Sequence, residues 1–359
     1  MKTYHKINYT KFLYIFFVIL SLNIFFFSTV KSEGKAFQID NIEISRPFKI
    51  NFNKNDVIDE GFRKAYSELI SLIVKSSDQK KIKKIQLNEI KGMIESFTIK
   101  EEKFIDETYS VNLGVIFNKK KIFNYLENKN VFPSIPKKKT FLFIPIIIDE
   151  SEKDLLIFYN NQIFDEWNKN QKKSHLLNYI LPTEDLEELN LLKSKFENIE
   201  KYDFKEITKK YDLKDFIIAL IFKNQNELRI LSKINLNENT VIRNQTYRNI
   251  NFKNKEKLDQ LIEDLKLIYE DYWKKENLIN TSIKLILNIK ANNLENNKIS
   301  AFEKILNETD LIYDFFISKF DKNYTYYQII FNGTPAIFLK KMSDKNQKFD
   351  TQNKNWILQ

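Results

Sequence analysis

The sequence predicts a mixed α+β and α/β protein made of three small modules in series. Two patterns alternate along the 359 residues: apolar residues at every second position, typical of strands, and apolar residues every three or four positions, typical of helices. A third observation is the segment 141–148, which is apolar on both faces and so resembles a strand covered by helices. A chain of this length can bury more than one core.

Residues 1–32 have the pattern of an export signal. A basic start with several lysines is followed by an apolar core at 12–27 and by small residues that end at Ser32. This predicts cleavage after Ser32 and a mature protein in the periplasm. The alternative is an uncleaved segment that anchors the protein in the inner membrane. The polar residues Ser21 and Asn23 inside the apolar core favour cleavage.

We expect the first module, 33–135, to have an α+β arrangement. In order, we expect a strand at 37–52 that breaks at Pro47, a helix at 57–75, a linker helix at 87–94, strands at 97–105 and 108–117 with a turn at Asp106-Glu107, and a lysine-rich helix from Asn118. The helix at 57–75 is entered through Asn55 and Asp56, and its apolar stripe predicts that it covers one face of a sheet.

Part of this module resembles a known family. The motif Gly61-Phe62-Arg63-Lys64-Ala65-Tyr66 is followed by the strand 109–117, a helix that ends at Leu126, and Phe132-Pro133. This order resembles the bacterial "domain of unknown function 2066" family of exported proteins, over roughly residues 37 to 150. Lysine and asparagine stand where members of the family have arginine and alanine. The family has no established activity, so the resemblance implies export and assigns no functional residues.

The second module, 136–277, is predicted to be α/β. After the strand at 141–148 we expect a helix at 162–170, a strand at 176–181, a helix capped by Thr183, a helix at 204–211, strands at 216–222, 228–236 and 240–252, and a helix at 255–275. The last helix has a clear apolar stripe from Leu258 to Tyr272, which predicts that it packs on the sheet.

The third module, 278–359, has the order βαββαβ. Its first strand alternates from Ile283 to Ile289, and its second helix begins at Gly333-Thr334-Pro335 with a threonine cap and a proline in the first turn. We expect residues 356–358 to form the final edge strand. This order of elements is that of a ferredoxin-like fold.

Composition excludes several kinds of chemistry. The chain has no cysteine, which excludes disulfides, thiolate nucleophiles, cysteine zinc sites and iron–sulfur ligation. Only His5 and His175 are present, so a multi-histidine metal site is excluded in the mature chain and a serine–histidine–aspartate triad is disfavoured. The five glycines are too dispersed for a phosphate-binding loop, and we expect no cofactor.

Acidic residues after the central strand are the first candidate site. Asp149 and Glu150 follow the carboxyl end of that strand, where α/β proteins often place ligands, and paired carboxylates can hold a cation or act as acid and base. The polar residues 151–154 continue as an ordinary turn, so we favour a solvated loop. His175 precedes a strand and is a candidate general base, but it has no spaced partner, so we favour a packing role.

Basic clusters and a pair of tyrosines are the remaining candidates. Lysines at 80–81, 83–84, 119–121 and 137–139 could meet anionic lipid or polysaccharide. The net charge of +10 rests on lysine, because only five of the 58 basic residues are arginine, and we favour a solvated face. Tyr326 and Tyr327 suggest RNA binding, but the expected motif is absent, so we favour packing.

These observations predict a non-catalytic, exported protein of the cell envelope that acts through protein or glycan contacts. One alternative is a carboxylate- or metal-dependent hydrolase of the envelope. Another is a polyanion-binding protein. An envelope protein or a glycan is the expected partner, nucleic acid is disfavoured, and contact with a membrane surface would use the N-terminal segment or the lysine clusters. The sequence leaves the oligomeric state open.

Overall fold

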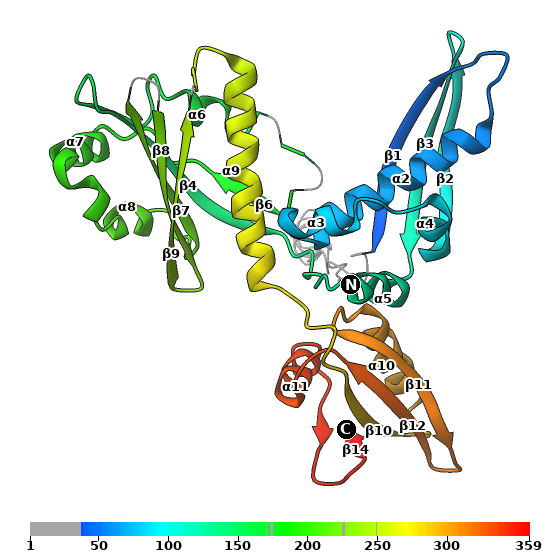
Figure 1. Ribbon diagram of the computed structural model, residues 1–359. Coiled ribbons are helices and arrows are strands. Elements are labelled where there is room, and N and C mark those ends of the chain that lie inside the picture. Colours follow the sequence, from blue (N-terminus) through cyan, green and yellow to red (C-terminus); the bar gives the residue numbers. More distant parts are fainter. Residues whose placement is uncertain (1–36, 170, 173–174, 225–226, 249) are drawn as a thin grey trace, which may run out of the picture.

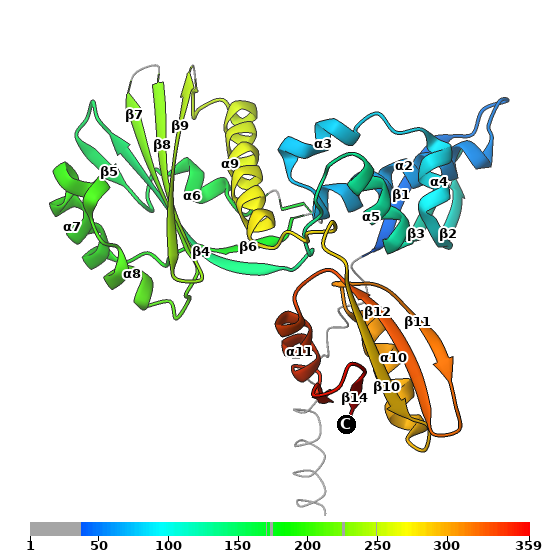
Figure 2. The same ribbon diagram turned by 60° about the horizontal axis from the view of Figure 1, so that its bottom comes forward.

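The computed structural model describes residues 37–169, 171–172, 175–224, 227–248 and 250–359. The predicted signal segment, 1–32, lies outside them. Within these residues the protein is mixed α/β with three separate β-sheets, which confirms the predicted class (Figures 1 and 2). No helix of this described part is both long and apolar enough to cross a membrane.

The first sheet is antiparallel and has the order β1-β3-β2. Its elements are β1 (Gln38–Pro47), α2 (Lys54–Ile73), α3 (Ser76–Ile82), α4 (Leu87–Met93), β2 (Ile94–Ile105), β3 (Thr108–Phe117) and α5 (Lys119–Asn128). Helix α2 covers one face, as predicted, and comes close to β3 at Gly61, where a Cβ would lie 2.4 Å from Leu113 Cδ1. The cap of α2 is Asn53, whose side chain accepts from the Asn55 N–H, so the helix begins earlier than predicted.

The second sheet has the order β5-β4-β7-β8-β9, with β6 also beside β4. Its elements are β4 (Lys139–Asp149), β5 (Asp154–Leu156), α6 (Gln162–Glu166), β6 (Leu177–Ile180), α7 (Leu186–Ser194), the 3-10 helix η2 (Phe196–Lys201), α8 (Lys205–Lys209), β7 (Phe216–Asn224), β8 (Glu227–Leu236), β9 (Asn239–Arg248) and α9 (Lys255–Glu276). β4 runs parallel to β6 and β7. The cap of α7 is Asp185 and not Thr183, because the Asp185 carboxylate accepts from the N–H groups of Glu187 and Glu188.

Strand β4 is covered on both faces, as its composition predicts. Phe141, Phe143 and Ile147 point into a core shared with α6 and α9. The alternate residues, among them Ile144 and Ile148, point into a second core shared with α7, η2 and α8. Successive side chains of a strand point to opposite faces, so a strand between two helical layers is apolar throughout.

The third sheet has the order β11-β12-β10-β14-β13. Its elements are β10 (Leu285–Asn292), α10 (Asn296–Glu308), β11 (Ile312–Phe320), β12 (Tyr324–Phe331), α11 (Pro335–Ser343), β13 (Phe349–Asp350) and β14 (Trp356–Leu358). The prediction that 356–358 forms the edge is wrong, because β14 lies between β10 and β13. Phe349 is held there by the rings of Phe338 and Trp356, at 5.6 and 6.4 Å between centroids.

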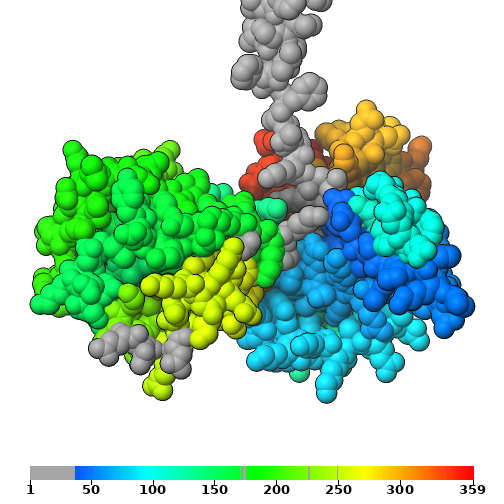
Figure 3. All heavy atoms as spheres, turned by 90° about the horizontal axis from the view of Figure 1, so that it is seen from above, coloured from blue at the N-terminus to red at the C-terminus, as the bar shows by residue number. Residues whose placement is uncertain are grey.

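The three sheets meet at the loop 129–138 and at the end of α9. Ser134 N–H donates to the Ile73 carbonyl at the end of α2, and Trp273 Nε1 of α9 donates to the Lys137 carbonyl. Ile279 N–H, which leads to the third sheet, donates to the Pro133 carbonyl. Figure 3 shows α9, in yellow, at the border between the first and second sheets. This one loop therefore joins all three parts.

Candidate functional site

A cavity of about 530 Å³ opens at the carboxyl ends of β4 and β7, two neighbouring parallel strands of the second sheet. Crevices at this edge of an α/β sheet are common ligand sites. Apolar residues form part of the wall, and four side-chain amides supply most of its polar groups. The lining residues are Ile147, Leu156, Asn160, Gln162, Lys223, Asn224, Glu227, Leu228, Ile250, Asn251, Phe252 and Lys253.

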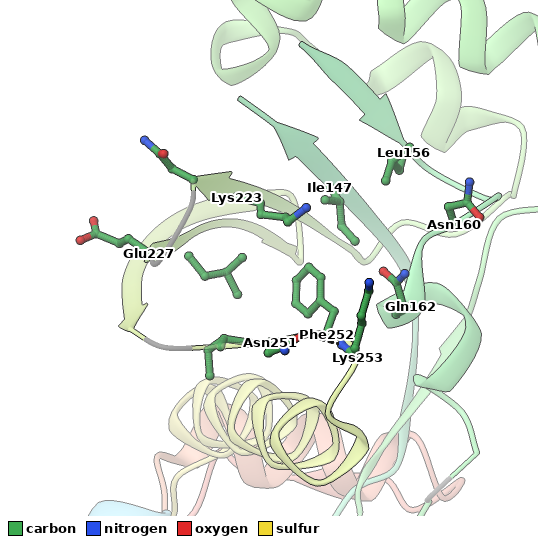
Figure 4. A pocket seen from close by; sticks show the side chains of 12 residues that line it. Ile147, Leu156, Asn160, Gln162, Lys223, Glu227, Asn251, Phe252 and Lys253 are labelled. Carbon is green, nitrogen blue, oxygen red and sulfur yellow. Dashed lines mark hydrogen bonds between the residues drawn. The ribbon is translucent and has the colours of Figure 1, made fainter. Parts of the chain in front are cut away.

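The close-up in Figure 4 shows how these side chains lie. Gln162, Lys223 and Lys253 point toward the space around the Phe252 ring, whereas the carboxylate of Glu227 points away from it. Amide groups both donate and accept hydrogen bonds, and an apolar ring supplies a flat contact surface. The cavity is thus suited to a ligand that carries hydroxyl or amide groups on an apolar frame.

Lys253 adds positive charge at one side of the cavity. It lies two residues before α9, a helix of 22 residues whose first turn is capped by Asn254. The amino end of a helix carries partial positive charge, so the two effects act in the same direction. The other lysine of the cavity, Lys223, is neutralised by an ion pair with Asp149. The site therefore offers one cation to an acidic substituent.

Asp149, the leading acidic candidate from the sequence, is held in a structural role. Its Oδ1 accepts from the N–H groups of Ser151 and Glu152 at 3.1 Å each, and its Oδ2 accepts from Lys223 at 2.7 Å. The hydrogen bond from Lys223 holds the pKa of Asp149 below its usual range. Glu150 is exposed on the following turn. Asp149 therefore fixes the turn after β4 and orients Lys223 at the cavity wall.

His175 lies away from this turn, just before β6 of the second sheet. It is buried beside α9, and its Nε2 is 4.0 Å from the Glu263 carboxylate. Burial lowers the pKa of His175, although Glu263 opposes the effect. Nothing brings His175 and Asp149 together: they line no common cavity and form no contact in the described residues. Nor do any three acidic or histidine side chains of these residues gather as a metal site would require.

The lysine clusters differ in their exposure and in their contacts. Lysines 80, 81, 83 and 84 are exposed, with Lys81 paired to Asp78. Lys119, in contrast, is half-buried, and its Nζ donates to the Thr309 carbonyl, just before β11 of the third sheet. Its neighbour Lys120 pairs with Asp314 of β11. Lys119 and Lys120 therefore join α5 to the third sheet, whereas Lys121 donates to the Gly92 carbonyl of α4. The predicted solvated face holds at 80–84.

The two tyrosines lie on opposite faces of β12. Tyr327 is buried under α10 and donates to Glu303 Oε1 at 2.6 Å. Tyr326 lies on the open face, where the Lys319 ammonium is 5.3 Å from the centre of its ring. The packing that the sequence predicts for the pair is therefore of two kinds: Tyr327 lies in the core, and Tyr326 packs against its cross-strand neighbour Lys319.

Comparison with known proteins identifies no family for the chain. No protein-family model matches the chain, and no curated protein matches it significantly. The cavity residues were not found from the sequence, because Asn160, Gln162, Asn251 and Lys253 stand in loops and caps without a motif. The available signal was indirect: they lie near the carboxyl end of the segment 141–148, where a ligand site was expected.

Proposed function

We propose that the protein is an exported, non-catalytic protein of the cell envelope and that the cavity beside β4 and β7 binds a segment of glycan. The observation that carries the proposal is the cavity lining, which combines four amides, the Phe252 ring and a single acid, Glu227; the amides are those of Asn160, Gln162, Asn224 and Asn251. Amides match the hydroxyl groups of a sugar, and the ring and aliphatic residues match its apolar face.

Export is part of the proposal and rests on the segment 1–32 and on the resemblance to the family of unknown function. A mature chain that begins at Glu33 and is recovered from the periplasm would support it. An uncleaved chain in the inner membrane would support the anchored form instead. The intact chain, with Met1, free in the cytosol would overturn export and the envelope role together.

We further propose that the chain is organised as modules 33–135, 136–277 and 278–359, the last of them ferredoxin-like. The order β11-β12-β10-β14 supports this, since it corresponds to the strand order of that fold. One departure is clear. β14 is parallel to β10, whereas the last strand of a ferredoxin-like sheet is antiparallel to the first, a direction that the outer strand β13 has here.

Calorimetric titration with a soluble muramidase digest of peptidoglycan tests the glycan site. We expect binding that is weakened at least tenfold by Gln162→Ala combined with Asn251→Ala. The matched control combines Gln260→Ala and Asn353→Ala, which change two exposed amides away from the cavity. Absence of binding by the unmodified protein would overturn the glycan assignment.

The same titration at several salt concentrations separates a glycan site from a polyanion site. Amide-mediated binding should change little between 50 and 200 mM salt. A polyanion binder would lose affinity by orders of magnitude over that range, because bound counterions are released. Such a loss would indicate that the ligand binds to the exposed lysines at 80–84 and not in the cavity.

Substitution of acidic residues after β4 distinguishes a hydrolase from a non-catalytic protein. Glu150→Ala combined with Glu152→Ala and Asp154→Ala, which keeps the pair of Asp149 with Lys223 at the cavity wall, should leave glycan binding unchanged. If the unmodified protein releases reducing ends from intact peptidoglycan and these variants do not, while their thermal unfolding is unaltered, the protein is a carboxylate-dependent hydrolase and the non-catalytic proposal is wrong.

A further inference from the structure

Strand β9 forms an open edge of the second sheet, with no described strand on its outer side. Asn237 and Glu238, both with positive φ, form the two-residue turn from β8, so the pair Leu236 and Asn239 closes the hairpin. From that pair onward, residues alternate between those bonded to β8 and those that face outward. The outward backbone N–H and C=O groups belong to Thr240, Ile242, Asn244 and Thr246.

Other edge strands of the described sheets carry features that block pairing. β1 has a shift in register and ends at Pro47, while β2 and β11 have two register shifts each and carry Lys100, Lys103 and Lys319. β5 and β13 have three and two residues. β9, in contrast, pairs with β8 over ten residues without a shift, and it contains neither proline nor lysine. β9 carries two arginines, but a long edge without a bulge or a proline is still a template for another strand.

The side chains of β9 indicate what kind of strand would pair with it. Ile242 is 61% exposed on the α8 side, and Arg243 is exposed on the α9 side. The strand carries Arg243 and Arg248 but no acid. A second copy of β9 that pairs in parallel register, or antiparallel and centred on Arg243, would place arginine against arginine, which is unfavourable across strands, and no register offers an acid to Arg243. A carboxylate opposite Arg243 would instead form a charge-assisted and often bidentate hydrogen bond.

We propose that β9 is a docking edge for an extended, acidic segment of a partner protein, which adds a strand to the second sheet. Main-chain hydrogen bonds from residues 240–246 would supply affinity, as in other cases of strand addition. Selectivity would come from carboxylates that face Arg243 on one side of the added strand and from apolar residues that face Ile242 on the other.

A synthetic peptide of ten residues that alternates glutamate with valine tests this edge on the purified protein. We expect binding, together with slowed hydrogen exchange of the outward amides of Ile242 and Asn244. The same peptide with lysine in place of glutamate should bind at least tenfold more weakly. A peptide N-methylated at every residue, which has no N–H group left to donate on either edge, should not bind, a result that needs no change to the protein.

Two substitutions locate the binding. Asn244→Pro removes one outward N–H without touching the hydrogen bonds to β8 and should weaken binding at least tenfold, whereas the control Asn244→Thr should not. Arg243→Gln should reduce the preference for glutamate over lysine. The proposal is overturned if neither peptide binds, if the N-methylated peptide binds equally well, or if sedimentation shows a dimer that Asn244→Pro dissociates, since a second copy would then occupy the edge.

Discussion

The ammonium group of Lys274 in α9 donates a hydrogen bond of 2.5 Å to the carbonyl oxygen of Ser71, which lies in the last turn of α2. A second hydrogen bond, at 3.3 Å, reaches the carbonyl of Val74. The last carbonyls of a helix have no partner within it, so α9, which packs on the second sheet, here supplies a donor to the end of α2, which packs on the first. Asp271 adds to the junction by accepting from the N–H of Ser76 at 2.8 Å.

Lys274→Met should therefore destabilise the protein. The Ser71 carbonyl would lose the donor Lys274, the Val74 carbonyl would keep only Gln79 Nε2, and the buried carboxylate of Glu270 would lose its nearby cation. We expect the free energy of unfolding to fall by about 2 kcal/mol. Chemical denaturation measures it, with Lys275→Met as the exposed control. An unchanged value would mean that the α2–α9 junction does not depend on this lysine.

Substitution of Lys266, two turns earlier on α9, should stabilise the protein. Lys266 is 1% exposed, its Nζ has no hydrogen-bond partner, and its nearest described aromatic contact is the Trp167 ring at 5.4 Å. Burial lowers the pKa of Lys266, which reflects the cost of keeping its charge there. Lys266→Met keeps the volume and removes that cost, so we expect stabilisation by about 1 kcal/mol. Lys255→Met, on the exposed side of α9, is the matched control. A loss of stability specific to Lys266→Met would contradict this interpretation.

Lys119 gives a prediction about pH. Burial lowers the pKa of Lys119 to about 8, against 10.5 for an ordinary lysine. Between these values the unfolded chain binds more protons than the folded protein, so stability should rise as the pH rises from about 8 to 10.5. The full difference corresponds to about 3 kcal/mol, and partial exposure reduces the expected gain to about 1–2 kcal/mol.

The measurement is a set of denaturation curves across this pH range, compared between the unmodified protein and Lys119→Met. The variant should lack the rise attributed to Lys119, whereas Lys121→Met, which changes an exposed neighbour, should retain it. Equal pH dependence in all three proteins would show that Lys119 is solvated in solution.

Much of the fold could be predicted because it depends on local patterns. The stripe of α2, the hairpin turn at Asp106-Glu107 and the doubly apolar β4 all follow from spacing along the chain. The helix α3 and the strands β5 and β13 were missed, because elements of seven, three and two residues have no periodic signal. The position of β14 depends on the ring cluster around Phe349, which spacing alone does not encode.

The candidate site was harder to predict, because its contacts join distant residues. Asp149 pairs with Lys223, 74 positions later, and that pair makes the carboxylate a structural group. Lys119 contacts Thr309, 190 positions later, which turns one member of a surface cluster into a junction residue. Neither partner can be chosen from composition, since the chain is rich in lysine and acids throughout.

The neighbouring tyrosines of β12 provide a direct test of the orientation of the third sheet. Tyr327→Ala should lower the free energy of unfolding by about 3–4 kcal/mol, because it removes a ring from the core beside Phe302. Tyr327→Phe should lower it by about 1 kcal/mol, because it removes the hydrogen bond to Glu303. Tyr326→Ala, on the open face, should change stability by less than about 1 kcal/mol. Denaturation of the three variants side by side measures these differences. If Tyr326→Ala proves the more destabilising of the two alanine variants, β12 is shifted by one residue and its faces are exchanged, because a one-residue shift in a strand moves every side chain to the opposite face.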